Sequence, residues 1–253
     1  MPTDELRPQP RVHLSGAILC QDNAAYIGTV LENMSPYCDE IVVVDGGSTD
    51  GTQDVVSAFP KVRLFERQWD GNFSRQKNYA YDRCKGRWIL NLDTDELLGG
   101  PGARWIRALT HVPGAHWYSF PRMWLVRGED GELKYLTSKR YWRDRQLRLF
   151  RNTPGFRYDE VRTPTHTEFA GKHGLGRALR QPWLYHYTFL MQSREQREAK
   201  CERYSKEHPD VEHLNRMYLW EESGSAMDSL PAPVPGSLVE TDSAPARAAD
   251  SPT

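Results

Sequence analysis

The chain has 253 residues, a formal net charge of -1 at pH 7 and 26% charged side chains. This length suffices for one large domain with a substantial core, or for one domain with a small appendage. The near-zero charge provides no basic field of the kind that binds nucleic acid, which excludes that class of partner. No apolar run approaches the roughly 20 residues that cross a bilayer, and residues 1–11 are polar and proline-rich, without the apolar stretch of a signal peptide. We therefore expect a cytoplasmic protein without a transmembrane segment.

The cysteines are scattered, with no close pair of the kind that forms a zinc site or a redox dithiol. Such spacing is typical of a protein in a reducing compartment, and we expect the thiols to be core residues. They are Cys20, Cys38, Cys84 and Cys201.

Residues 12–98 alternate between two kinds of pattern. Short apolar runs bounded by turn residues predict strands; they cover 12–20, 40–45, 62–65 and 88–92. Helical spacing of apolar side chains behind polar capping residues predicts helices between them; they cover 24–34, the residues between Asp50 and Pro60, and 74–84. Gln53 stands three positions after Asp50, as in a capping box. The alternation predicts an α/β fold with a mostly parallel central sheet flanked by helices.

Polar clusters follow three of the predicted strands. They are Asp22-Asn23, residues 45–51 and residues 93–96. The continuous β-branched run before the second cluster predicts a strand buried on both faces, which is typical of parallel sheets. In open sheets of this kind, ligands bind beyond the carboxyl ends of the strands. We therefore expect the three clusters to converge on one rim.

Asp93, Asp95 and Glu96 place three acids within four positions at the end of the predicted strand 88–92. Carboxylates this close repel one another and lose solvation, so a positive partner is expected among them. A divalent cation held by one or two carboxylates, with water and substrate phosphates completing its shell, meets this need. The alternative is a polar strand exit whose acids face water.

The second half of the chain has a looser pattern. It predicts a short helix over 105–109, strands over 116–126 and 145–150 around a hairpin turn at Asp130-Gly131, an aromatic segment over 183–189, and a charged helix from Ser193 to about Lys206. Beyond about 224 the composition predicts disorder. The predicted organisation is a flexible N-terminus (1–11), an α/β half (12–98), a second half with C-terminal helices (99–223) and a disordered tail (224–253).

Two motifs together resemble a known family. The stretch Ile41 to Thr52, with Asp45-Gly46-Gly47-Ser48-Thr49-Asp50-Gly51 at its centre, is followed by Leu92-Asp93-Thr94-Asp95-Glu96. In this order and spacing they resemble family 2 glycosyltransferases of the GT-A fold, and the variant with Gly46 is similar to the subgroup of lipopolysaccharide-core glucosyltransferases and bacteriocin-peptide glycosyltransferases. The resemblance spans residues 12–206 and is strongest over 41–98.

The resemblance implies a donor site. Its donor-binding residues would be Asp22, Asp45, Gln76, Lys77, Asn78 and Asp93. Asp45 would hydrogen-bond the base or ribose of a nucleotide sugar, or else cap the turn. A cation at Lys77 suits a diphosphate, although a solvated helix face explains this segment equally well. The opening Cys20-Gln21-Asp22-Asn23 differs from the more usual Cys-Lys-Asn-Glu, which bears on the identity of the donor.

The resemblance also implies a metal site formed by Asp93 and Asp95, with Mn²⁺ or Mg²⁺ as the cofactor. His186 falls where such enzymes often have a histidine that reaches the metal or the diphosphate. A lone histidine between aromatic residues is otherwise usually a core residue. Nitrogen ligation would favour manganese over magnesium.

The general base is expected after Phe150-Arg151-Asn152, where the subgroup has a Val-His-Glu motif. Here the later segment reads Pro164-Thr165-His166-Thr167-Glu168, so the acid is displaced by one residue. Glu168 is the preferred base for deprotonating an acceptor hydroxyl. Asp159 and Glu160 compete with it, and Glu96 is a further alternative.

The predicted function is that of an inverting, metal-dependent glycosyltransferase with a nucleoside-diphosphate sugar as donor, preferably a UDP-sugar. The acceptor is open among a glycan, a lipid-linked sugar, a peptide and a small natural product. Basic residues in 140–151 are consistent with an anionic acceptor or peripheral contact with a membrane, and equally with a solvated strand face. The alternatives are a sugar-phosphate nucleotidyltransferase, although no glycine-rich phosphate loop follows the first strand, and a non-catalytic nucleotide-sugar-binding module.

Overall fold

The computed structural model describes residues 12–138, 141, 144–161, 169–171, 173–207, 218–219 and 226–235. Its strands are β1 (Leu14–Cys20), β2 (Glu40–Asp45), β3 (Val62–Glu66), β4 (Trp88–Asn91), β5 (Glu96–Gly99), β6 (Trp117–Arg127), β7 (Leu133–Leu136), β8 (Arg145–Arg151), β9 (Gly176–Ala178), β10 (Trp183–His186) and β11 (Met227–Ser229). Its helices are α1 (Ile27–Met34), α2 (Thr52–Ser57), α3 (Phe73–Arg83), α4 (Ile106–Leu109), α6 (Thr188–Met191) and α7 (Arg194–Glu207), with 3-10 turns η1 (Ala103–Trp105) and η2 (Pro154–Phe156).

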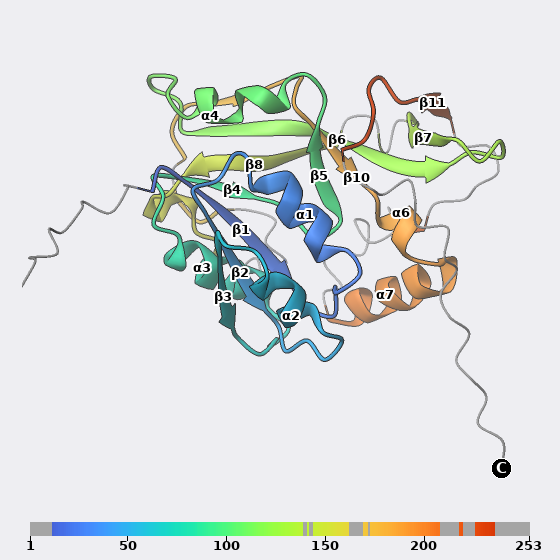
Figure 1. Cartoon of the computed structure of the whole chain (residues 1–253), viewed down its shortest axis with the longest axis horizontal. Coiled ribbons are helices and arrows are strands. Elements are labelled where there is room, and N and C mark those ends of the chain that lie inside the picture. Colours follow the sequence, from blue (N-terminus) through green and yellow to red (C-terminus); the bar gives the residue numbers. More distant parts are fainter. Residues whose placement is uncertain are drawn as a thin grey trace, which may run out of the picture.

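One sheet runs through both halves of the described chain in the order β11-β7-β6-β8-β4-β1-β2-β3. The strands β4, β1, β2 and β3 run parallel to one another, which confirms the predicted parallel centre. β8 then joins β4 in the antiparallel direction, and β6 joins β8 likewise. Figure 1 shows β6 and β8 extending the sheet away from β1, β2 and β3.

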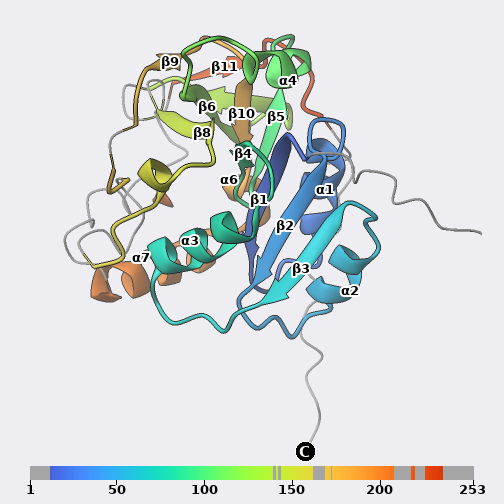
Figure 2. The same ribbon diagram turned by 90° about the vertical axis from the view of Figure 1, so that its left-hand side faces the viewer.

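Helices cover both faces of the parallel part, with α1 and α2 on one side and α3 on the other (Figure 2). The alternation along β2 explains this arrangement, because successive side chains of a strand point to opposite faces. Ile41 and Val43 join the core under α1, whereas Val42 and Val44 join the core with Tyr81 of α3. All of these side chains are fully buried, as the continuous β-branched run predicts.

The local predictions succeed and fail for identifiable reasons. The 130–131 turn does connect antiparallel strands, β6 and β7, and Ser193 does form a capping box with Gln196. The predicted capping role of Gln53 is wrong, because its amide donates to Asp45 instead. Asn72, two residues before the predicted start of the helix at 74, caps α3 by accepting the Arg75 N–H.

Five of the described strands, β5, β7, β9, β10 and β11, are absent from the sequence prediction. β5 has only four residues and begins shortly after β4 ends, so in the sequence it looks like part of the loop that leaves β4. β11 pairs with β7 inside the stretch that composition predicts to be disordered, so the prediction of disorder does not hold for Met227–Ser229. All four cysteines are free and buried, as expected.

Candidate functional site

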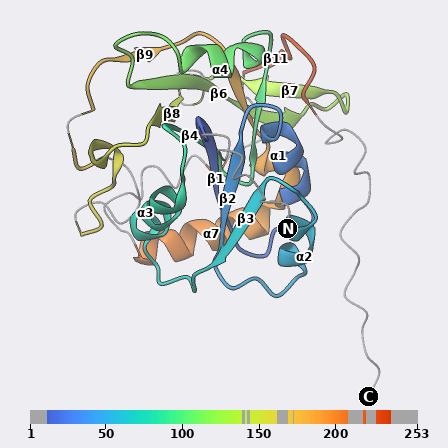
Figure 3. The ribbon, with the colours of Figure 1, turned by 60° about the vertical axis from the view of Figure 1, so that its left-hand side comes forward.

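The carboxyl ends of the parallel strands meet at one edge of the sheet. Cys20 is paired with Asp45, and Asp45 with Glu66, so β1, β2 and β3 finish in register. Asp93 follows β4, the neighbour of β1 on the other side. Figure 3 shows α7 lying near this same end of β1 and β2. The predicted convergence of the polar clusters on one rim is therefore present.

The loops after β1 and β2 are clasped together. Asp22, which adopts a positive φ of 51°, accepts the Thr49 N–H at 2.8 Å through Oδ1. In return, the Asp22 N–H donates to Ser48 Oγ at 2.8 Å. The Ala24 N–H donates to Asp50 Oδ2 at 2.9 Å. Asp22 and Asp50 therefore fix the shape of the rim.

Asp45 is fully buried and is engaged by its own turn. Its Oδ2 accepts the N–H groups of Gly47 and Ser48 at 3.1 and 2.9 Å and the Gln53 amide at 2.9 Å. Burial raises the pKa of this carboxyl, but the Ser48 and Gln53 hydrogen bonds outweigh it and lower the pKa overall. These bonds support the turn-capping alternative, and contact between Asp45 and a nucleotide stays a prediction.

Asp93 lies between two buried cations. Lys77 Nζ approaches Oδ1 at 2.9 Å, and Arg148 Nη2 approaches Oδ2 at 2.5 Å. The Lys77 and Arg148 side chains are only 2% and 5% exposed. Burial lowers the pKa of Lys77, and the facing Asp93 offsets part of that effect. The positive partner expected among the acids is thus supplied by the protein itself at Asp93.

Asp95 faces a different partner. Its Oδ2 lies 3.2 Å from His186 Nε2, and the Tyr187 N–H donates to the Asp95 carbonyl at 3.0 Å. Burial opposes ionisation of Asp95, yet His186 and then Lys200 of α7 hold its pKa well below the ordinary value. The imidazole of His186 packs on Trp124, with ring centroids 4.1 Å apart.

A buried chain of ion pairs connects these residues to the second half. Arg148 Nη2 also bonds Glu96 Oε1 at 2.6 Å, and Glu96 is fully buried. Arg122 Nη1 lies 3.5 Å from Glu96, and its Nε lies 2.5 Å from Asp144. Asp144 also accepts the indole N–H of Trp124 at 2.9 Å. Glu96 is therefore an internal partner of arginines, which argues against its alternative role as a base.

Sequence reasoning did not identify Arg148, Arg122 or Asp144 as site residues. Arg148 lies between Leu147 and Leu149, where alternation reads as the solvated face of a strand. In the structure that face of β8 covers Asp93, because β8 lies beside β4. The only available signal was that the acids at 93–96 need buried cations.

The side chains of Gln76, Lys77 and Asn78 contact different parts of the structure. Gln76 Nε2 donates to the Arg67 carbonyl at 2.8 Å. Asn78 exchanges hydrogen bonds with the Tyr158 backbone at 2.9 and 3.0 Å. Lys77 contacts Asp93 and Asn78 also donates to Glu160, whereas Gln76 bonds the Arg67 backbone.

The candidate bases are placed unequally. Glu160 Oε1 accepts from Asn78 at 2.9 Å, and its Oε2 lies 3.4 Å from Arg75 Nε, so this carboxylate helps to attach its loop to α3. Asp159 accepts the Val161 N–H at 3.0 Å. Glu168 lies outside the described residues.

The donor atoms of Asp95 and His186 fit a shared divalent cation. Two adjacent ligands of an octahedral ion, each at about 2.1 Å, lie about 3 Å apart, close to the 3.2 Å between Asp95 Oδ2 and His186 Nε2. His186 Nδ1 has no hydrogen-bond partner among the described residues. No group of three or more His, Cys, Asp or Glu side chains converges within the described part of the chain. A bound ion would therefore rely on water and substrate oxygens for most of its shell.

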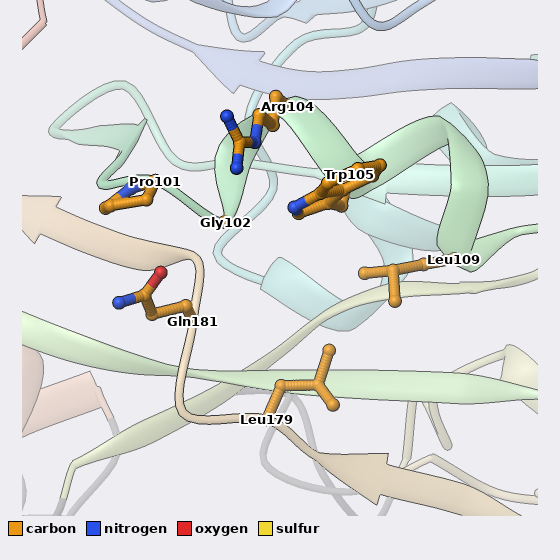
Figure 4. A pocket seen from close by; sticks show the side chains of 7 residues that line it. All are labelled: Pro101, Gly102, Arg104, Trp105, Leu109, Leu179 and Gln181. Atoms are coloured by element: carbon orange, nitrogen blue, oxygen red, sulfur yellow. The ribbon is translucent and has the colours of Figure 1, made fainter.

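A separate cavity of about 390 Å³ is found at the other end of the molecule. β5 runs back from the rim, antiparallel to β10, and the residues after it line this cavity together with Leu179 and Gln181. In Figure 4 the ring of Trp105 and the side chain of Arg104 border it from one side. None of the candidate site residues lines it.

The sheet order, the rim and the paired aspartates define an α/β protein of the GT-A type. Residues 22–100 match the family model described as glycosyl transferase family 2. This part of the chain is similar to family 2 glycosyltransferase domains. No helix among the described residues is long and apolar enough to span a membrane.

Relatives of known name share this domain. The chain is 39% identical over 93 residues to a lipopolysaccharide core biosynthesis glycosyltransferase, LpsC, of Rhizobium meliloti, covering 35% of this chain and 34% of that protein. It is 30% identical over 81 residues to the prophage-derived glycosyltransferase SunS of Bacillus subtilis, covering 32% of this chain and 19% of SunS. The chain spans about a third of the length of the first curated relatives it matches.

Solved structures overlap the chain at TM-scores below 0.5. The structure of S. aureus TarS 1-349 in complex with UDP has a TM-score of 0.49 and 14% identity, covering 83% of this chain and 70% of that one. The structure of glucosyl-3-phosphoglycerate synthase from Mycobacterium tuberculosis with Mn²⁺ and UDP-glucose has a TM-score of 0.37 and 19% identity, covering 45% and 44%.

Proposed function

We propose that this chain transfers a sugar from a nucleoside-diphosphate sugar, preferably a UDP-sugar, to an acceptor hydroxyl or other nucleophile with inversion at the anomeric carbon. One observation carries the proposal. Asp93 and Asp95 leave the same strand end but enter opposite environments, Asp93 between Lys77 and Arg148 and Asp95 beside His186. The site thus combines fixed cations, which can neutralise diphosphate charge, with a carboxylate–imidazole pair that fits a divalent cation able to do the same.

The residues of the rim would divide the work as follows. Lys77 would stabilise the negative charge of the departing diphosphate, and Arg148 would orient Asp93 beside it. Asp95 and His186 would hold Mn²⁺ or Mg²⁺, with Asp93 a weaker candidate because both its oxygens already bond cations. When bound, such an ion supplies further neutralisation of the diphosphate charge.

The transfer would be a single displacement. The acceptor oxygen forms a bond to the anomeric carbon while the bond from that carbon to the diphosphate oxygen breaks. A carboxylate takes the acceptor proton, and Glu168, Glu160 and Asp159 remain the candidates. Residues 12–98 would bind the donor and residues 99–223 the acceptor, which we leave open among a glycan, a lipid-linked sugar, a peptide and a small natural product.

The test is thermal stabilisation by a panel of nucleoside diphosphates and nucleotide sugars, with and without manganese. A ligand that binds only the native state at about 100 times its Kd adds about 2.7 kcal/mol, a rise of roughly 5–10 °C for a chain of this size. We expect one diphosphate to act, and the manganese-dependent part to disappear in Asp95→Ala. Asp54→Asn, an exposed carboxylate on α2, is the matched control. No shift with any nucleotide would refute the transferase proposal.

A further inference from the structure

The Gly46–Gly47 pair stands at the end of β2, between the ends of β1 and β3. Figure 2 shows these three strands side by side. The Gly46 N–H donates to the Cys20 carbonyl at 2.8 Å, and the Trp69 N–H donates to the Gly46 carbonyl at 3.0 Å. The two glycines therefore form a bare stretch of backbone between the residues that follow the neighbouring strands.

A glutamine side chain lies against each glycine. A Cβ placed on Gly46 would lie 3.3 Å from both Cβ and Oε1 of Gln21. A Cβ placed on Gly47, where φ is +100°, would lie 2.5 Å from Oε1 and 3.0 Å from Nε2 of Gln68. A Cβ at Gly47 would displace the Gln68 amide, and a Cβ at Gly46 would crowd Gln21, so the diglycine leaves room for both side chains.

Both glutamines are exposed, and neither amide has a hydrogen-bond partner among the described residues. The backbone on either side of each glutamine is, by contrast, held by hydrogen bonds. The Gln21 N–H donates to Asn23 Oδ1 at 3.2 Å, and the next residue, Asp22, is clasped to the β2 loop. On the other side, Arg67 and Trp69 both bond the backbone at the end of β2. Two amides with unused donors and acceptors are thus presented by an ordered rim.

We propose that Gln21 and Gln68 select the nucleobase of the donor, and that the base they select is uracil. This inference rests on the proposed function, because the base belongs to the nucleotide whose diphosphate would lie at Lys77 and Asp95. The imide edge of uracil presents one N–H between two carbonyl oxygens. A primary amide offers both donor and acceptor, so one amide carbonyl can accept the N–H while the amide NH₂ groups donate to the flanking oxygens. Such pairing discriminates strongly, since a wrong base leaves polar groups unpaired.

The experiment is calorimetric titration of the full chain, with manganese present, by UDP, GDP, CDP, ADP and inorganic pyrophosphate. Gln21→Ala and Gln68→Ala are compared with wild type and with Gln181→Ala, a matched amide removal in the distant cavity. We expect wild type to prefer UDP, each of the two substitutions to weaken UDP about tenfold, and pyrophosphate binding to stay unchanged. Gln181→Ala should behave as wild type.

The outcomes separate the two proposals. If wild type binds none of the diphosphates, the proposed function fails, and this inference fails with it. If wild type prefers UDP and both glutamine variants keep that preference, the proposed function stands and the assignment of Gln21 and Gln68 is overturned. A wild-type preference for another base overturns the assignment of uracil. Equal weakening of UDP and pyrophosphate would show a general disturbance of the rim, and would also count against base selection.

Discussion

Arg148→Met tests whether the buried arginine holds the site together. The substitution keeps a long side chain but removes the guanidinium that bonds Asp93 and Glu96. Glu96 is fully buried and would keep Arg122, 3.5 Å away, as its described cationic partner. Breaking a buried ion pair from one side costs about 3–5 kcal/mol, because the other charge stays buried and uncompensated. For a chain of this size that loss lowers Tm by roughly 6–20 °C.

The measurement is urea unfolding, followed by a double-mutant cycle with Glu96→Gln. Removing the acid as well should restore part of the stability, so the double variant should lose clearly less than the sum of the single losses. Arg145→Met is the control, because Arg145 on the same strand is exposed and bonds the Ser119 carbonyl at 3.1 Å. A loss below about 1 kcal/mol in Arg148→Met, or strict additivity with Glu96→Gln, would refute the reasoning.

Two further predictions concern stability away from the rim. Burial raises the pKa of Glu40, but the Lys85 N–H, Ser15 and Arg63 outweigh it and lower the pKa below its ordinary value of 4.5. A depressed pKa contributes stability above pH 4.5, and this stability is lost as the pH falls through the folded-state pKa. The stability difference between wild type and Glu40→Gln should therefore shrink on acidification. A difference that does not change with pH in urea titrations would contradict this. Gly99→Ala should destabilise the protein by about 1–3 kcal/mol, because its Cβ would lie 2.1 Å from Tyr185 Cε2. Gly28→Ala in α1 meets only ordinary contacts and should stabilise the protein by up to about 1 kcal/mol. Equal thermal shifts for the two variants would show that the crowding at Gly99 is relieved without cost.

The sequence predicts the parts of the site that depend on chain-local pattern. The β-branched run 41–44 and the acids after 88–92 are visible because periodicity and composition act within a few residues. Arg148 is not visible, because its role depends on β8 lying antiparallel beside β4, across a long connection. Gln53 shows the same limit. Its sequence position fits a capping box, but its amide instead donates to Asp45, which the intervening turn brings close to it. Pairings between distant elements therefore account for most of what the sequence leaves open.

The charges of the site also predict the sign of one result. Its paired side chains comprise four carboxylates and three permanent cations, which are Asp93, Asp95, Glu96 and Asp144 against Lys77, Arg122 and Arg148. Counted without His186, the balance is 3 - 4 = -1, and Lys200 of α7 offsets this at longer range. Of these four carboxylates, Asp95 is the one without a lysine or arginine partner among the described residues, so we expect it to oppose an incoming diphosphate.

Asp95→Asn should therefore have opposite effects in the two conditions. Without manganese it should bind UDP about threefold or more tightly than wild type, because one opposing charge is removed. With manganese it should bind UDP more weakly than wild type, because the carboxylate that would hold the ion is gone. Calorimetry of both proteins with and without the ion gives the four values needed, with Asp54→Asn as the control for loss of an exposed carboxylate on α2. Weaker binding by Asp95→Asn in both conditions would mean that Asp95 shapes the pocket itself, and that its charge is not what sets the need for a cation.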